Sequence, residues 1–356
     1  MNRVAIFGAC GEVGQHIDQA LCALGYQVTR IGRQPRPDLT HYRIVDLYDQ
    51  KEVAAVCHHH DLIINAAGPA SAIRDNIARV AIDTHTLYVD VGGEQDVFGH
   101  VQQQLQGRDL PVSCVFGAGF VPGFTSLLPF IAKEKLQELH SIELYVGGIE
   151  AFTSTSAIDF IASLGGNDAL SGVVIRDDIK VREGTREGYQ PLPEGKEFTA
   201  LPYLSAEHQR VANTLSISNF AAFNLVADRQ LLMSANESAK EQTAALVSLS
   251  QSMVQKHGTQ QYCVMDVQGW IAQQPVNLTL RCKFNDGYRM TGMVAAFTAH
   301  QLLTQSSSHL NNGVFWLSEI VETGHLISFL HEQNMFSHWD LSIEPNYELA
   351  FEEGAL

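Results

Sequence analysis

No run of apolar residues in this chain approaches the roughly 18 that a membrane-spanning helix needs. The chain enters an apolar, strand-like segment at once, so we expect neither a membrane anchor nor a signal peptide. None of its six cysteines form a CxxC pair, and most lie in apolar runs. This pattern predicts reduced, buried thiols in a cytoplasmic protein, and neither disulfides nor a cysteine metal site.

Positive charge is also scarce, because the formal net charge is −16 at pH 7. A surface this acidic repels nucleic acid and anionic membranes, so we expect neither as a partner. The adjacent His58, His59 and His60 cannot share one helix face, and we therefore predict no metal site there. The length allows two domains with a sizeable core.

A glycine turn near the start carries the strongest signal. The apolar run Val4–Phe7 predicts a buried strand, and a helical pattern with Ile17 and Leu21 on one face follows the glycines. Strand, glycine turn and helix together form the arrangement that receives a dinucleotide pyrophosphate. The spacing is GxxGxxG, not the strict GxGxxG, and the alternative is an ordinary tight βα turn. The predicted pyrophosphate contacts are Gly8, Ala9, Cys10, Gly11, Glu12, Val13 and Gly14.

The second predicted strand, Tyr26–Ile31, lacks the acid that in NAD enzymes binds the ribose 2′-hydroxyl. No acid occurs before Asp38, whereas Arg30, Gly32 and Arg33 surround the strand end. We therefore predict NADP(H), with Arg33 and Arg30 on the 2′-phosphate. The alternative is that these arginines belong to a solvated loop.

Two further strand ends complete the predicted cofactor site. Asp46 and Leu47 follow a third strand and are candidates for an adenine pocket, although Asp46 could instead cap the helix that begins near Asp49. Small residues follow a fourth strand at the sheet edge where ligands bind. These residues are Asn65, Ala66, Ala67, Gly68 and Pro69.

Asp90 and Glu94 follow the fifth strand and are the candidate catalytic acid or base, since partial burial could bring a carboxyl pKa into a useful range. The alternative is that Asp90 only caps or orients the loop. Alternation makes Tyr88 a core residue. The dense Gly119, Phe120, Val121, Pro122 and Gly123 are predicted to form a loop on the nicotinamide side.

Regular βαβ alternation predicts a Rossmann doubly wound parallel sheet, and the mixed pattern beyond it predicts a second α+β domain with a mostly antiparallel sheet. We place the NADP-binding domain at residues 1–118, with 311–334 packing back on it, and the substrate and dimerisation domain at 119–310. Within the second domain, 183–198 is predicted to be a hairpin or flap.

Several segments occur in an order that resembles one family. They are GACGEVG, VTRIGR, INAAGP, LYVDVGGE and GAGFVPGF, with NGVFWLSEI compatible as a closing segment. Together they resemble the saccharopine dehydrogenase (saccharopine reductase)-like NADP-dependent oxidoreductases. The specific match covers the first domain, and INAAGP followed by YVD-x-GGE is its most specific element.

The resemblance implies NADP(H) as cofactor, a homodimer, and reduction or oxidation of a carbon–nitrogen bond in an amino-acid-derived secondary amine or imine. Two alternatives stay open: a reductase of another carbonyl or enoyl substrate, and a non-catalytic NADP(H) sensor. Tyr189 and His208 are further candidates for substrate contact. A carboxylate substrate would need a cation from the second domain. The candidates are Arg176, Lys180, Arg182, Arg186, Lys196 and Arg210.

Overall fold

The computed structural model describes residues 2–93, 95–105, 112–165, 169–228, 238–304 and 312–346. The chain forms two compact units, and each combines stretches that are distant in sequence. The first unit comprises Met1–Phe124 and Gly287–Leu330, and the second comprises Thr125–Asp286 and His331–Leu356. None of the described helices is long and apolar enough to cross a membrane.

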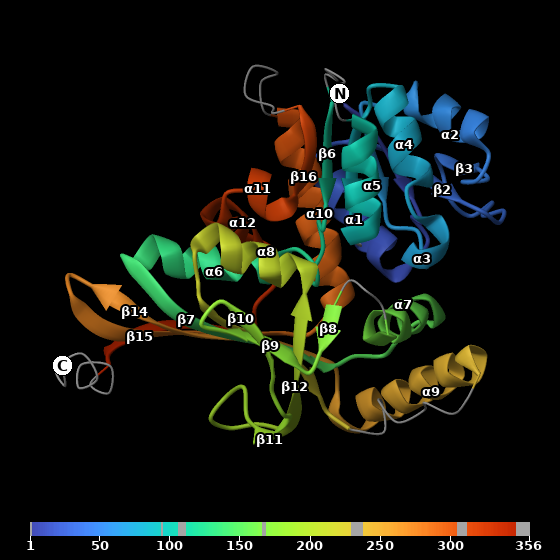
Figure 1. Ribbon diagram of the computed structural model, residues 1–356. Coiled ribbons are helices and arrows are strands. Elements are labelled where there is room, and N and C mark those ends of the chain that lie inside the picture. The colour runs from blue at the N-terminus through green and yellow to red at the C-terminus, as the bar shows by residue number, and fades with distance from the viewer. Residues whose placement is uncertain are drawn as a thin grey trace. The chain divides into compact units, whose positions relative to one another are not determined.

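A seven-stranded sheet forms the centre of the first unit (Figure 1). Its strand order is β16-β6-β5-β4-β1-β2-β3, and every neighbouring pair is parallel. Six of these strands have the 3-2-1-4-5-6 order of a doubly wound dinucleotide-binding sheet, so this predicted fold class is confirmed. The strands are β1 (Arg3–Phe7), β2 (Gln27–Gly32), β3 (Tyr42–Ile44), β4 (Leu62–Asn65), β5 (Leu87–Asp90), β6 (Ser113–Phe116) and β16 (Gly313–Trp316).

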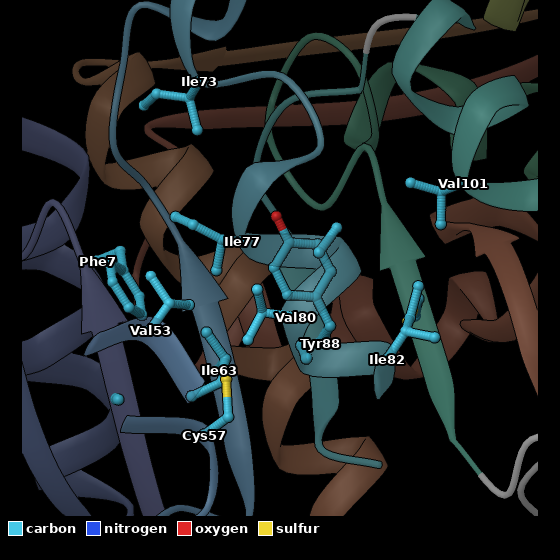
Figure 2. Close-up of a cluster of buried hydrophobic side chains, with 14 of the residues drawn as sticks. Phe7, Val53, Cys57, Ile63, Ile73, Ile77, Val80, Ile82, Tyr88 and Val101 are labelled. Atoms are coloured by element: carbon cyan, nitrogen blue, oxygen red, sulfur yellow. The ribbon is translucent and has the colours of Figure 1, made fainter. Parts of the chain in front are cut away.

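The central strands are short apolar runs because helices cover both of their faces. All four residues of β4 are buried, and so are all four of β6. Figure 2 shows one side of this core, where the Tyr88 ring lies beside Ile77 and Val80. Tyr88 is fully buried, as its alternation predicts.

The first five helices of this unit lie between β1 and β6, the sixth precedes β16, and the last two follow it. These helices are α1 (Glu12–Ala23), α2 (Gln50–Cys57), α3 (Ala70–Ile73), α4 (Asn76–Asp83), α5 (Gln95–Leu105), α10 (Gly287–Thr304), α11 (Leu317–Ile320) and α12 (Thr323–Glu332). Asp49 is the N-cap of α2, where its side chain accepts hydrogen bonds from the backbone N–H groups of Lys51 and Glu52. Asp46 is therefore not the cap of this helix.

The helix α10 packs against α1 and so belongs to the first unit, although the sequence pattern places 287–310 in the second domain. The two helices approach closely at Gly292, where an added Cβ would lie 2.5 Å from the Cβ of His16. The residues Asn285-Asp286-Gly287 have the composition of a hairpin turn, but they lead from β15 into α10. A turn signal alone does not determine whether a strand or a helix comes after the turn.

The second unit contains a ten-stranded sheet in which β13 and β7 pair in parallel and the other pairs are antiparallel. The predicted mostly antiparallel α+β domain is therefore confirmed as a fold class. Its strands are β7 (Glu138–Ile149), β8 (Ala169–Ser171), β9 (Val173–Arg176), β10 (Ile179–Arg182), β11 (Arg186–Tyr189), β12 (Phe198–Ser205), β13 (Asn219–Val226), β14 (Gln260–Ile271), β15 (Gln274–Phe284) and β17 (His338–Pro345).

The helices of the second unit are α6 (Phe124–Lys135), α7 (Ser154–Gly165), α8 (Ala206–Leu215) and α9 (Ala239–His257). The pattern of Val173–Val181 predicts one strand, but the segment forms β9 and β10 joined at Asp177 and Asp178, which both have positive φ. The strand β17 pairs with β15 and extends the sheet into the tail that the sequence pattern leaves unassigned.

Candidate functional site

The glycine turn adopts the geometry that each of its glycines predicts. Gly8 has φ of +79°, which a residue with a Cβ rarely adopts, and an added Cβ would lie 2.5 Å from the backbone oxygen of Ala66. An added Cβ at Gly14 would lie 2.2 Å from the oxygen of Gly8. Gly8 and Gly14 are therefore fixed by packing within the protein.

Gly11 differs from the other two glycines because its surroundings are open. An added Cβ there would meet only the oxygen of Gly8, at 3.3 Å. Gly11 is the N-cap of α1, and no side chain caps this helix. The first-turn N–H groups of α1 lack intrahelical acceptors and so suit an anion such as a pyrophosphate. This geometry fits the predicted cofactor site.

The three arginines in and just after β2 have different surroundings. The Nε of Arg30 donates to Asp18 Oδ2 at 2.9 Å, and its Nη1 donates to the oxygen of Thr40 at 2.8 Å. Arg36 forms two hydrogen bonds with Asp38. Arg33 is exposed and makes no hydrogen bond or ion pair within the described residues. Of the two arginines predicted to bind the 2′-phosphate, Arg33 is the one whose guanidinium is open to a ligand.

The last residue of β2 packs against the side chain of the first residue of β3. An added Cβ at Gly32 would lie 2.2 Å from the hydroxyl of Tyr42, so Gly32 makes room for that ring. Asp46 is exposed, and its Oδ1 accepts the N–H of Tyr48 at 2.9 Å. Leu47 packs against the buried core. Asp46 is thus exposed and Leu47 is half-buried, and neither residue lies in an enclosed pocket.

Asn65 and Asp90 meet at the carboxyl ends of β4 and β5. Asn65 Nδ2 donates to Asp90 Oδ2 at 3.0 Å, and the Tyr88 hydroxyl donates to the same oxygen. Asn65 Oδ1 accepts the N–H of Ala67 at 3.1 Å, and Asp90 Oδ1 accepts the N–H of Gly92 at 3.0 Å. One buried pair thus fixes the loop after β4 and the loop after β5.

Burial raises the pKa of Asp90 to about 6, although the hydrogen bonds from Tyr88, Asn65 and Gly92 oppose this shift. Only 8% of Asp90 is exposed, and both carboxyl oxygens have donors within the protein. These contacts favour the alternative in which Asp90 orients the loop over its role as a catalytic acid or base. Glu94, the second predicted catalytic residue, lies outside the described residues.

The loop after β6 is anchored to both neighbouring elements. The N–H of Ala118 donates to the oxygen of Asp90 at 2.8 Å, and the N–H of Phe120 donates to Thr291 Oγ1 on α10 at 3.2 Å. An added Cβ at Gly123 would lie 2.1 Å from the oxygen of Gly117, so the loop closes tightly on itself. Its tip is Val121, which is 47% exposed, beside Pro122. The loop therefore presents an apolar tip on a fixed glycine frame.

The candidate substrate cations of the second unit are mostly engaged in contacts within that unit. Arg186 pairs with Glu143 at 2.6 Å and with Glu183 at 2.6 Å. Arg176 pairs with Glu183 at 2.8 Å. Burial raises the pKa of Glu143, but the hydrogen bonds from Arg186 and Tyr145 outweigh it and leave the pKa below its ordinary value. The positive charges of Arg176 and Arg186 are thus already compensated.

Of the other candidate residues of the second unit, Tyr189 and His208 serve its packing. Tyr189 stacks on Tyr145 with ring centroids 4.0 Å apart. His208 is buried in the capping box of α8, and burial lowers its pKa to about 4. Lys180 and Arg182 are exposed on β10, and the Nζ of Lys196 lies 3.4 Å from Nε2 of His257. Arg210 is partly buried in α8.

Comparison with known proteins supports the dinucleotide-binding geometry. Residues 4–123 match the model of the NAD dependent epimerase/dehydratase family. The whole chain resembles the saccharopine dehydrogenase (L-Glu forming) of Saccharomyces cerevisiae, with a TM-score of 0.71, 13% identity, and coverage of 97% of this chain and 100% of that chain. The chain has the fold of saccharopine dehydrogenase. The predicted resemblance is thereby confirmed as a likeness of fold.

Two other structures share this saccharopine dehydrogenase fold more distantly. One is the DAP dehydrogenase of C. glutamicum in complex with DAP, with a TM-score of 0.52 and 14% identity over 94% of this chain and 99% of that chain. The other is an engineered D-amino acid dehydrogenase bound to NADP+, with a TM-score of 0.52 and 15% identity over 94% of this chain and 99% of that chain.

Two residues at the site are not indicated by the sequence pattern. The Trp316 ring stacks on Phe98 with centroids 4.5 Å apart, and it lies so close to Gly93 that an added Cβ would be 2.7 Å from Trp316 Cζ3. Thr291 holds the loop after β6. Both residues lie far along the chain from the loops that they contact, so no local pattern indicates their role.

Proposed function

We propose that this chain is an NADP-dependent oxidoreductase of the saccharopine dehydrogenase-like type, which reduces or oxidises a carbon–nitrogen bond of an amino-acid-derived substrate. The observation that carries the proposal is the whole-length likeness to saccharopine dehydrogenase, combined with an open glycine turn at an uncapped helix. The other two structures are, by their names, dehydrogenases of amino acids, and one is bound to NADP+. The homodimer and the cytoplasmic location stay predictions from the sequence.

Cofactor binding in this proposal uses the carboxyl edge of the parallel sheet. The N–H groups of Gly8, Ala9 and Gly11 already donate to backbone oxygens of the protein, so the pyrophosphate is bound by the first-turn N–H groups of α1, from Glu12 to Gly14. The exposed Arg33 binds the 2′-phosphate. Asn65–Pro69 border the nicotinamide ribose, and Gly119–Gly123 border the nicotinamide. Asp46 and Leu47 lie on the adenine side.

When bound, the nicotinamide cofactor supplies the hydride transfer, so the protein need only bind, orient and exclude water. The Asn65–Asp90 pair holds two edge loops in fixed positions, and the tight loop that ends at Gly123 offers an apolar wall. Fixed loops of this kind reduce the loss of freedom on binding. We do not assign the proton-transfer role to Asp90, because its carboxyl oxygens are already hydrogen-bonded within the protein.

The assignment of NADP is tested by the dissociation constants of NADPH and NADH, measured by fluorescence titration. We expect the unaltered chain to bind NADPH more tightly, because only NADPH offers a phosphate to Arg33. In Arg33→Ala, NADPH binding should weaken about tenfold or more, the loss expected from one charge-assisted contact, and NADH binding should hardly change. Arg43→Ala removes the same charge from an exposed residue of β3 and serves as the control.

Equal affinities for NADPH and NADH in the unaltered chain would contradict the assignment of NADP. The reaction itself is tested by incubating the protein and NADPH with pairs of amino acids and keto acids or aldehydes, while the absorbance of NADPH is followed. Oxidation with at least one pair is expected. If no pair oxidises NADPH, a carbonyl or enoyl reductase or a non-catalytic sensor becomes the better hypothesis.

A further inference from the structure

Tyr48 is an exposed aromatic residue that is nevertheless fixed at both ends. Tyr48 is 59% exposed. Its N–H donates to Asp46 Oδ1 at 2.9 Å, and its hydroxyl donates to the backbone oxygen of Ala72 at 3.2 Å. A tyrosine held in this way gives up side-chain freedom without gaining much burial. Two hydrogen bonds hold Tyr48 in position, whereas its ring contributes little to the packing of the protein.

The hydrogen bond from Tyr48 to Ala72 spans the part of the sheet edge that contains the glycine turn. Tyr48 lies between β3 and α2, and Ala72 lies in α3, directly after the loop that follows β4. In the sheet, β1 and β2 lie between β4 and β3. The glycine turn follows β1, and Arg33 follows β2. Tyr48 therefore joins the two loops that flank these two features.

The neighbours of Tyr48 leave its ring available to a ligand. Leu47, the preceding residue, packs into the core, so the local segment is anchored without the Tyr48 ring. Ile44, at the end of β3, is also 55% exposed. An aromatic ring that is already fixed loses little entropy when a flat partner stacks on it. Stacking on an aromatic side chain is a common way in which proteins bind a nucleobase.

We propose that the ring of Tyr48 is the surface on which the adenine of the dinucleotide stacks. This inference rests on the proposed NADP-binding function and adds a contact that the motif-based prediction of Asp46 and Leu47 does not contain. The hydroxyl has a separate role, because it holds the ring in place through Ala72 and does not touch the base.

The test uses the full chain and three variants: Tyr48→Ala, Tyr48→Phe, and Ile44→Ala as a control that also removes an exposed apolar side chain next to the site. Dissociation constants for NADP+, 2′,5′-ADP and nicotinamide mononucleotide are measured by titration calorimetry. In Tyr48→Ala, the affinities for NADP+ and 2′,5′-ADP should both fall about tenfold or more, the loss typical of one base–aromatic stack. The affinity for nicotinamide mononucleotide should not change.

Tyr48→Phe keeps the ring, so its losses should be much smaller than those of Tyr48→Ala, and Ile44→Ala should bind like the unaltered chain. NMR gives a second readout, because the adenine H2 and H8 resonances of bound 2′,5′-ADP should shift upfield through the ring current in the unaltered chain and in Tyr48→Phe. These shifts should be absent in Tyr48→Ala.

Unchanged affinity in Tyr48→Ala would overturn the stacking role, and so would equal losses for 2′,5′-ADP and nicotinamide mononucleotide. Equal losses in Ile44→Ala would overturn it as well, because they would indicate a general disturbance of the edge. If the unaltered chain binds neither NADP+ nor 2′,5′-ADP, the proposed function itself fails. If the unaltered chain binds both ligands and the Tyr48 variants bind them equally well, only the stacking role fails.

Discussion

At the scale of the residue, Asp90 is a carboxyl group whose burial couples stability to pH. Its pKa rises from 3.8 to about 6, chiefly because burial disfavours the charged form. At a pH between these two pKa values, the folded chain therefore keeps a proton on Asp90 that the unfolded chain has already released. The stabilising contribution of this group is complete below the unfolded pKa and is lost as the pH rises through about 6. The loss is about 3 kcal/mol at roughly 1.4 kcal/mol per pKa unit.

Replacing Asp90 by Asn should remove this pH dependence, because the amide does not titrate. Urea denaturation at about pH 4 and at about pH 7 would give the free energy of unfolding of the variant and of the unaltered chain. The difference between Asp90→Asn and the unaltered chain should shift by about 2.4 kcal/mol in favour of the variant as the pH rises from about 4 to 7, since part of the full change already occurs below pH 4. Asp61→Asn is the control, since Asp61 is exposed and accepts a hydrogen bond from the N–H of Arg3. A difference that stays constant with pH would contradict the expected pKa of Asp90.

The residue types at the site could be predicted from the sequence, but their pairings could not. The glycines, Asn65 and Asp90 follow recognisable strands, so their place at the sheet edge is predictable. The bonds from Arg30 to Asp18 and from Asn65 to Asp90 depend on the register of strands and helices that are far apart in sequence. A titratable group at the edge therefore looks catalytic until its buried partners are known.

At the scale of the element, the contact between α1 and α10 depends on one glycine. An added Cβ at Gly292 would lie 2.5 Å from His16 Cβ and 3.1 Å from the backbone nitrogen of Ile17. Gly292→Ala should therefore destabilise the chain by about 1–3 kcal/mol, the usual cost of overpacking. Thermal or urea unfolding measures this change.

Gly99→Ala in α5 is the matched control, because no atom lies within 4 Å of a Cβ added at Gly99. Alanine favours a helix interior over glycine, so this substitution should stabilise the chain by up to about 1 kcal/mol. The opposite signs of two identical substitutions separate helix packing from helix propensity. Equal effects at both positions would show that the α1–α10 contact tolerates an extra methyl group.

The order of elements in the first unit is predictable from local patterns up to β6, because each strand and helix there packs next to a neighbour in sequence. The membership of α10 is not, since a helix with apolar residues nearly all round, such as Met290, Val294 and Phe297, carries no sign of which sheet it covers. In the strand β17, Trp339, Leu341 and Ile343 alternate with polar residues. This alternation is a local signal from which the strand can be predicted.

At the scale of the whole molecule, the first unit requires two separate stretches of chain. A fragment that ends at Phe124, close to the end of the family match, would lack α10 and β16. It would expose the face of α1 that packs on α10 and leave Phe98 without the stacked Trp316 ring. Loss of one large buried aromatic side chain alone costs about 3–5 kcal/mol, which is comparable with the total stability of many domains.

We therefore expect the fragment 1–124 to retain secondary structure but to lack fixed packing, with a strong far-UV and a weak near-UV circular dichroism spectrum. Joining residues 287–330 to it through a flexible linker should restore a cooperative unfolding transition, because both missing elements return to the sheet. Trp316 is the only tryptophan of the joined fragment, so its fluorescence reports directly on the restored core. Cooperative unfolding of 1–124 alone would show instead that the βαβ segment folds without α10 and β16, and that these elements only add to a core that already exists.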